Sequence, residues 1–392
     1  MTPAVSLYLD LVRFFAAFVV LLSHFGYARI SGGEYLVFRR FGSDAVVLFF
    51  VLSGYVIAYV AAQREHNLRE YTVSRLARLY SVALPALVVT VVLDQIGQRI
   101  DPGHYKGWWY AGDGPLGRFL ANLFFVNQLW FNSVRPFSNG PYWSLGYEFW
   151  YYALFGIAYY LRGRRRALLL VLAGLVIGPK VLLQLPVWLL GVWTYHYNRR
   201  SVVPPWLASV LFLAPFVVYP VIKTTGWDIA VREWTLAVLG PDFVLKQLRW
   251  SDEFVISQAY AVLIAMNFVG AQALGERLGG VLRRIERPIR YWAGFTFSMY
   301  LFHYPLLQFF AAVYGSGRGD AWRHALLFGS TVLCVVVLGY ISEHRKRAYQ
   351  RFFTVLLERV PGSSHSSHAV EYENGVREKE NGRPVSASRH MK

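Results

Sequence analysis

Ionisable side chains stand inside apolar runs of this sequence, where a charge is costly unless it has a partner or a function. The first run places Arg13 and His24 eleven residues apart. On a helix this spacing brings them within ~20° of the same face, about 16 Å apart along the axis. Asp10 precedes Arg13 by one turn and is expected to pair with it. A neutral imidazole can take the proton of a hydroxyl group, so His24 is a candidate general base.

A carboxylate occupies a similar position in a later run. Glu148 lies about two turns into the segment 141–152, PYWSLGYEFWYY, where aromatic residues surround it. A sheltered carboxylate can act as a general base, or it can orient the histidine that does. The alternative is a structural Glu148 that is hydrogen-bonded in the core.

Two arginines follow the second apolar run. Arg75 and Arg78 are three residues apart and share one helical face. Two guanidinium groups on one face suit a ligand that carries several phosphates. The equally simple alternative is a membrane anchor that binds lipid headgroups.

The remaining candidates lie in two further apolar segments. Ser53 and Gly54, in FFVLSGY, are small enough to let two helices approach closely. Tyr300 and His303 stand in FSMYLFHYP, where Pro305 is expected to kink the helix. A histidine in such a place is either a hydrogen-bonded core residue or a member of the site.

Membrane-spanning helices are needed to position these residues. Hydrophobic residues make up 55% of the 392 residues and charged residues 16%, against about 25% charged in a soluble domain. Eleven apolar runs are candidate spans, and several of them approach the ~20 residues that cross a bilayer. The sequence therefore predicts an all-α, polytopic transmembrane bundle rather than a soluble, disordered or disulfide-rich protein.

Basic clusters predict the topology, because cytoplasmic loops carry the excess of lysine and arginine. They fit about ten spans with both termini in the cytoplasm, provided that 119–132 is a re-entrant or interfacial segment. Asn122, Asn127 and Gln128 interrupt that segment. The two spans predicted within 167–197 are short and nearly fused.

The composition divides the chain into two parts. Residues 1–347 form the predicted integral-membrane domain, and 348–392 a cytoplasmic, largely disordered tail. The net charge of +17 comes from short clusters between apolar runs, so nucleic acid is not an expected partner. Cys334 is the single cysteine, which excludes an intrachain disulfide and a thiolate cluster, and no metal site is expected.

Taken together, these segments resemble the membrane-bound acyltransferase 3 family, whose members O-acylate sugars and other hydroxyl acceptors. The resemblance covers most of 5–347 and follows the family order. It rests on Leu9-Asp10, Arg13 and His24; Phe49-Phe50 with Ser53-Gly54; Arg75 with Arg78; Trp143-Ser144-Leu145 with Glu148; and Ser298, Tyr300-Leu301, His303 and Pro305. Two departures are Ser81, where the family typically has proline, and the ending Glu343-His344-Arg345 in place of Glu-Arg-Pro.

The resemblance implies an O-acyltransferase of a bacterial inner membrane. Its donor substrate is acetyl-CoA or another acyl-CoA, its acceptor is a glycan or glycolipid, and no cofactor is bound. The implied residues are catalytic His24, Glu148 and Arg13, donor-binding Arg75, Arg78 and Ser53, and acceptor or supporting Asp10, Tyr142, Trp143, Ser144, Tyr300 and His303.

Alternatives remain open at this point. The acyl group can pass directly to the acceptor or through an acyl-enzyme on His24 or Ser53. A proton-coupled secondary transporter also needs embedded ionisable residues, although the sequence shows no two equivalent halves. A scaffold for polysaccharide assembly would leave His24 and Glu148 unexplained.

Overall fold

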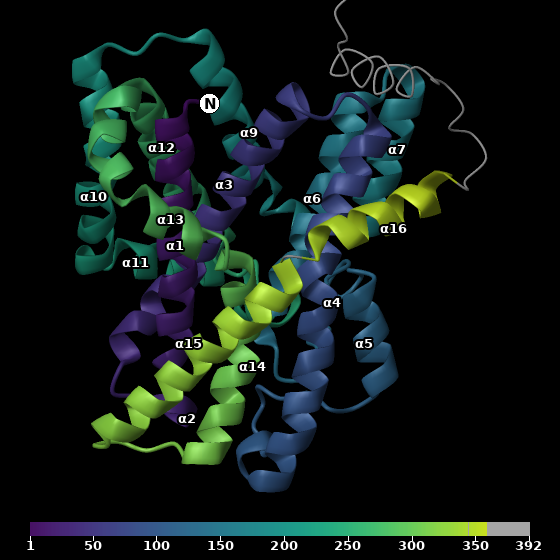
Figure 1. Cartoon of the computed structure of the whole chain (residues 1–392), viewed down its shortest axis with the longest axis vertical. Coiled ribbons are helices and arrows are strands. Elements are labelled where there is room, and N and C mark those ends of the chain that lie inside the picture. The colour runs from purple at the N-terminus through teal and green to yellow at the C-terminus, as the bar shows by residue number, and fades with distance from the viewer. Residues whose placement is uncertain (344, 359–392) are drawn as a thin grey trace, which may run out of the picture.

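The computed structural model describes residues 1–343 and 345–358, and these residues form helices and no strand (Figure 1). This confirms the predicted all-helical class. The α-helices are α1 (Pro3–Phe25), α2 (Ala28–Ser31), α3 (Gly42–Gln63), α4 (Leu68–Ile100), α5 (Pro115–Leu123), α6 (Trp143–Tyr160), α7 (Gly163–Ile177), α8 (Pro179–Leu182), α9 (Leu185–Arg200), α10 (Pro205–Thr225), α11 (Trp227–Leu239), α12 (Phe254–Leu282), α13 (Glu286–Ala293), α14 (Thr296–Tyr314), α15 (Ala321–Glu343) and α16 (Lys346–Glu358). The 3-10 or π turns are η1 (Leu36–Phe41), η2 (His104–Lys106), η3 (Gly140–Tyr142), η4 (Phe243–Gln247) and η5 (Arg283–Ile285).

The predicted count of about ten membrane spans is not confirmed by the length and composition of the helices. Within the described chain, six helical segments are long and apolar enough, or seven if one bent pair counts as a span. The helices α6 and α14 are outside this set. Both are rich in tyrosine, and they carry Glu148 and His303, whereas α1, α3 and α4, which also carry candidate site residues, are within the set.

The bent pair lies where the sequence predicts two short, nearly fused spans. The helix α7 and the following α8–α9 segment meet at 110°. Gly178 stands at the break with φ of +79°, and a Cβ there would lie 2.6 Å from the Cα of Trp130. Pro179 and Pro186 occupy the first turns of α8 and α9, where proline is tolerated.

The segment 119–132 includes the end of a short helix. The helix α5 has nine residues, whereas about 20 are needed to span a bilayer. Irregular chain follows it, yet Phe125, Asn127 and Gln128 are buried. This is the arrangement expected of a re-entrant or interfacial segment.

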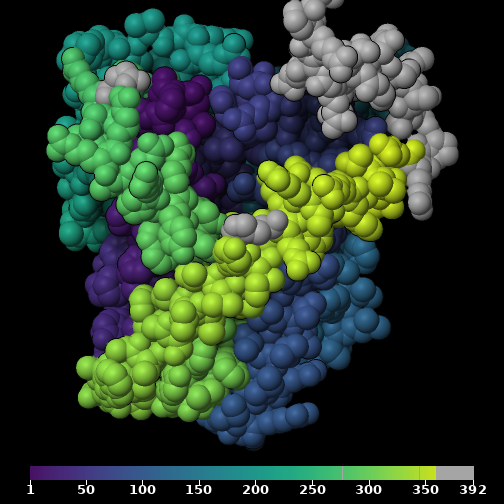
Figure 2. Space-filling model, viewed as in Figure 1, coloured from purple at the N-terminus to yellow at the C-terminus, as the bar shows by residue number. Residues whose placement is uncertain are grey.

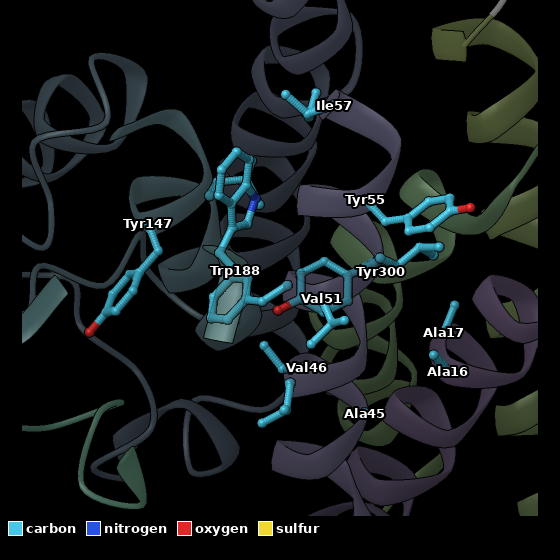
Figure 3. Packing of buried hydrophobic residues seen from close by; sticks show 14 of the residues in the cluster. Ala16, Ala17, Ala45, Val46, Val51, Tyr55, Ile57, Tyr147, Trp188 and Tyr300 are labelled. Atoms are coloured by element: carbon cyan, nitrogen blue, oxygen red, sulfur yellow. The ribbon is translucent and has the colours of Figure 1, made fainter. Parts of the chain in front are cut away.

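The helix α3 lies at the centre of the bundle. Figure 3 shows Trp188 and Tyr147 on one side of α3, and Ala16 and Ala17 of α1 on the other. All four side chains are buried in the main hydrophobic cluster. The helix that carries Ser53 is therefore packed on two sides.

Two glycines allow α3 and α9 to cross closely. A Cβ at Gly54 would lie 2.0 Å from the carbonyl oxygen of Trp188, and one at Gly191 would lie 1.9 Å from that of Val51. Because no side chain fits at either position, the backbones are in direct contact. The crossing places Ser53 beside α9, where the indole Nε1 of Trp188 donates to its Oγ at 3.2 Å.

A carboxylate of α15 holds the start of α14. The backbone N–H and the hydroxyl of Ser298 donate to Oε1 of Glu343 at 3.1 and 2.7 Å. A carboxylate is favourable at a helix N-terminus because the first N–H groups lack partners within the helix. This contact helps to fix the helix that carries Tyr300 and His303.

The helix α16 crosses one face of the molecule, and Figure 2 shows the surface hollowed between α13 and α16. The side chain of Phe353 is buried against Tyr80, with ring centroids 5.4 Å apart. Arg69 pairs with Glu358 at 2.6 Å. The first residues of the predicted tail are thus helical and packed on α4, and residues 359–392 lie outside the described part of the chain.

Candidate active site

A cavity brings together predicted residues from five helices. It encloses about 770 Å³, its open mouth included, among α1, α3, α4, α6 and α14. Its walls contain Arg13, Ser53, Arg75, Arg78, Ser144, Glu148 and Tyr300. Residues separated by up to 287 positions therefore meet at one place, and the polar groups converge within otherwise apolar walls.

Arg13 enters the cavity with its charge compensated. Its Nη2 lies 2.8 Å from Oδ1 of Asp10, which confirms the pairing predicted from the sequence. The other carboxylate oxygen of Asp10 accepts from Arg290 of α13. Asp10 thus joins α1 to α13 and fixes Arg13 at the cavity wall.

The two arginines of α4 differ in their partners. Arg75 is buried and pairs with buried Glu65, with Nη2 and Oε1 2.5 Å apart. Arg78 lies within the electrostatic influence of Glu148, Tyr152 and Glu343, and no salt bridge joins it to a carboxylate within the described residues. Arg78 is therefore the better candidate for an incoming phosphate, and Arg75 supports it from a neutralised pair.

Glu148 belongs to a polar group at the centre of the cavity wall. Its Oε1 accepts from the hydroxyl of Ser53 at 3.1 Å and from that of Tyr152 in a short hydrogen bond. Ser53 in turn accepts from Trp188. Three helices, α3, α6 and α9, are joined through this one serine hydroxyl.

His24 lies at the far end of α1 and is paired with His303 of α14. Nδ1 of His24 and Nε2 of His303 are 3.0 Å apart. Nδ1 of His303 lies 2.7 Å from the carbonyl oxygen of Met299, and Nδ1 of His24 lies 2.9 Å from that of Val20. Each ring is thus tied to the turn before it in its own helix.

These contacts determine which nitrogen of His24 is basic. A carbonyl oxygen only accepts, so Nδ1 of His303 carries its proton and Nε2 of the neutral ring is an acceptor. Nδ1 of His24 then faces two acceptors and must also carry a proton. The lone pair of neutral His24 is therefore at Nε2, where it can remove a proton from a substrate.

Tyr300 joins the cavity to the histidine pair. It lines the cavity, and its ring centroid lies 6.4 Å from that of His303. Its hydroxyl lies 2.7 Å from Oγ of Ser144 and donates to the carbonyl of Pro141 at 3.1 Å. Tyr300 therefore borders the cavity on one side and lies beside His303 on the other, with its hydroxyl held by Ser144 and Pro141.

The structure separates two residues that the sequence analysis expects together. The expected orienting partner of His24 is Glu148. Glu148 instead bonds with Ser53 and Tyr152 at the cavity, and His303 occupies the orienting position beside His24. His24 is not among the residues that line the cavity. The physical reason is that α1 extends about 16 Å beyond Arg13 to reach His24.

The two aromatic residues Tyr142 and Trp143, which precede Glu148, differ in burial. Tyr142 is fully buried, so its ring faces protein and cannot stack on a sugar in this conformation. Trp143 is half-buried and stacks on Trp250, with centroids 5.4 Å apart and planes at 7°. Both rings of this stacked pair are half-buried, so Trp143 is more accessible than Tyr142.

Several site residues are absent from the sequence-based set. Tyr152 follows Glu148 by four residues, so helical spacing was a usable signal for it. Glu65 precedes Arg75 by ten residues across a turn, and Glu343 comes from α15. No local pattern links these two carboxylates to the site.

Comparisons with known proteins agree with this architecture. Residues 6–341 match the model of an acyltransferase domain, the acyltransferase 3 family. A relative named an O-acetyl transferase, from Shigella phage Sf6, is 28% identical over 156 residues. The alignment covers 38% of this chain and 44% of that relative, so the chain spans less than half of its length. No solved structure matches the chain significantly.

The helical membrane fold and the buried polar site define an integral-membrane transferase of the acyltransferase class. Because the family model covers nearly the whole described chain, this protein belongs to the acyltransferase 3 family.

Proposed function

We propose that this protein is an O-acyltransferase that moves an acyl group, most simply acetyl, from acyl-CoA to a hydroxyl of a cell-surface glycan or glycolipid. The family and the phage O-acetyl transferase support an O-acyltransferase. The observation that carries the proposal is the His24–His303 pair, which leaves Nε2 of His24 as a base.

The proposed acyl transfer needs one proton acceptor and donor, and His24 can serve as both. Nε2 of His24 takes the proton of the acceptor hydroxyl as the oxygen attacks the thioester carbonyl carbon. The C–O bond forms, the C–S bond of the resulting tetrahedral intermediate breaks, and the leaving thiolate takes a proton from the imidazolium. The products are the O-acyl ester and free CoA, and His24 returns to its neutral state.

The donor binds at the cavity in this proposal. Arg78 and Arg75 face the CoA phosphates, because arginine matches the fork geometry of phosphate oxygens. Arg13, at the same wall, guides the acyl arm toward His24. The donor enters from the cytoplasm of a bacterial cell, and both termini of the chain lie on that side.

The test is transfer of radiolabel from acetyl-CoA by the protein in proteoliposomes, with envelope glycans of the host as acceptor. The wild type should label the glycan, and His24→Ala should lower the rate by about 10²–10⁴-fold. His196→Ala, which removes a half-buried histidine of α9, is the matched control and should retain the activity. Proton-coupled uptake of solute without label transfer would instead favour a transporter.

The same assay separates the two chemical routes. A direct transfer needs both substrates on the enzyme together. An acyl-enzyme on His24 or Ser53 gives ping-pong kinetics and retains label without acceptor. The hydrogen bonds of Ser53 to Glu148 and Trp188 support a structural role for this serine, and we expect direct transfer.

A further inference from the structure

A second group of positive side chains surrounds the end of α1 at which His24 lies. Arg29 of α2 donates a short hydrogen bond to the hydroxyl of Tyr304. The ring centroid of Tyr304 lies 4.7 Å from that of His24. The guanidinium of Arg29 also lies 4.2 Å from the ring centroid of Tyr27. Arg29 is therefore separated from His24 by a single aromatic ring.

Arg135 extends this positive surface from another part of the chain. Its Nη1 donates to the carbonyl oxygens of Trp108 and Trp109. The guanidinium lies 5.5 Å from the ring centroid of Trp108 and 5.9 Å from that of Trp250. Its Nε is buried without a hydrogen-bond partner. An acceptor group of a bound ligand would satisfy this donor.

Two more arginines complete the group. Arg249 lies 5.3 Å from the ring of Trp250, and Arg39 lies 4.7 Å from the ring of Tyr27. Burial, with Arg249 and Arg29 nearby, lowers the pKa of Arg135 to about 10. Arg29 and Arg39 are also close enough to act electrostatically on His24. We call Arg29, Arg39, Arg135 and Arg249 the arginine cluster.

The arginine cluster lacks the carboxylates that other arginines of this protein have. Arg13, Arg75 and Arg118 pair with Asp10, Glu65 and Asp113. Within residues 1–343 and 345–358, no member of the cluster has an ion pair with a carboxylate. Partly buried like charges repel one another and lose hydration. An anionic ligand would relieve both penalties.

The aromatic rings between the arginines are suited to pack against a sugar ring. The indole of Trp108 is 72% exposed, whereas Trp250 is half-buried and stacks on Trp143. Flat exposed rings with polar groups at their edges can pack against the apolar face of a sugar ring. Positive groups and indole faces alternate here, so the surface fits a ligand that is both a saccharide and an anion.

We infer that the acceptor is a negatively charged saccharide, bound by the arginine cluster and by Trp108 and Trp250 so that one hydroxyl reaches Nε2 of His24. The inference rests on the proposed acyl transfer and adds the chemical class of the acceptor. The charge is a carboxylate or a phosphate, since a guanidinium group binds both through paired hydrogen bonds. Neutral sugars lack the group that the cluster binds.

Equilibrium binding tests this inference separately from catalysis. The full chain is placed in nanodiscs of zwitterionic lipid and titrated with three fluorescent tetrasaccharides. One is an oligogalacturonate, the second is its carboxyl-reduced neutral counterpart, and the third is the neutral form carrying one phosphate. We expect at least one anionic probe to bind about ten-fold more tightly than the neutral one, and the difference to shrink with added salt.

Matched variants assign the preference to residues. Arg29→Gln and Arg135→Gln should each weaken binding of the preferred anionic probe about ten-fold and leave the neutral probe unchanged. Arg232→Gln removes the same charge from a site near Asp252 and Glu253 and should have no effect. The identity of the preferred probe distinguishes a carboxylate from a phosphate.

Two outcomes overturn the inference. One is equal binding of anionic and neutral probes. The other is that Arg29→Gln and Arg135→Gln change only the anionic lipids that copurify in native mass spectra, which would make the cluster a lipid site. Label transfer from acetyl-CoA is measured in parallel. Its absence beside an arginine-dependent anion preference would count against the proposed function and leave the anion site standing.

Discussion

Two histidines that are 279 positions apart in the chain share one hydrogen bond. Neither is diagnostic alone, since a buried histidine is commonly a satisfied core residue. The two rings and the carbonyl oxygens of Val20 and Met299 form one hydrogen-bonded chain, which fixes the positions of the ring protons. In the proposed reaction His24 is the base, and these contacts make His303 its positioning residue.

Replacing His303 tests this positioning role. In His303→Ala, Nδ1 of His24 keeps only the carbonyl of Val20, so the ring is less well oriented. We expect kcat to fall about ten- to hundred-fold, with small changes in KM for both substrates. His303→Gln offers an acceptor oxygen and should recover part of the rate. An unchanged kcat in His303→Ala would contradict the role, as would a loss confined to KM.

Arg78 is expected to matter more for the donor than for the acceptor. Arg78→Gln removes the cavity arginine that forms no salt bridge with a carboxylate in the described part of the chain, so a CoA phosphate loses a charge-assisted contact. The apparent KM for acetyl-CoA should rise about ten-fold, while KM for the acceptor stays within two-fold. Initial rates at varied acetyl-CoA measure this. Equal donor dependence in variant and wild type would make Arg78 a membrane anchor.

Arg75 is expected to affect stability first. Arg75→Gln leaves Glu65 buried and unpaired, which costs about 3–5 kcal/mol in comparable buried pairs. The double variant Glu65→Gln/Arg75→Gln removes both charges and should recover most of that loss. Thermal unfolding in detergent reports the difference. A double variant no more stable than Arg75→Gln would show that the pair does not hold α4 in place.

The site residues could be predicted to different degrees. The pairing of Arg13 with Asp10 follows from their spacing within one helix, and the residues that line the cavity lie in recognisable sequence segments. The partner of His24 could not be predicted, because it depends on how far α1 and α14 extend relative to each other. A choice between Glu148 and His303 requires the depth of each residue in the bundle, which helical spacing does not contain.

At the scale of elements, the crossing of α3 and α9 depends on glycine. Gly191→Ala places a methyl group in the backbone of α3 and should force the helices apart, at a cost of about 1–3 kcal/mol. Gly174→Ala in α7 is the control, because a Cβ there meets nothing within 4 Å. Thermal unfolding measures both variants. Equal stabilities would show that the crossing can relax without loss.

The helices themselves were largely predictable and the spans less so. Long apolar runs such as the one that forms α1 read directly as helices. The helices α6 and α14 are less clear because buried tyrosines and a histidine, stabilised by partners in other helices, lower their hydropathy. The bend at Gly178 depends on the contact with Trp130, a long-range effect. Polar residues therefore obscure α6 and α14 as spans, whereas α1, α3 and α4 remain clear although they also carry candidate site residues.

At the scale of the whole molecule, the N-terminus and η2 lie at opposite ends of the bundle in Figure 1. The proposed topology puts η2 outside the cytoplasm. In a Cys334→Ser background, Lys106→Cys should react with an impermeant maleimide added to intact cells. Thr2→Cys should react only after the membrane is permeabilised. The reverse pattern would invert the topology and move the proposed donor side.

The packing of Tyr300 also bears on whether ions can pass through the bundle. Its ring meets Phe49, with centroids 5.5 Å apart, and its hydroxyl is fixed by Ser144 and Pro141. A route for substrates through a bilayer is also a route for ions unless something seals it. Under the proposed transfer, the Tyr300 ring would have to move aside for the acyl arm to reach His24, and its return would close the same passage to ions.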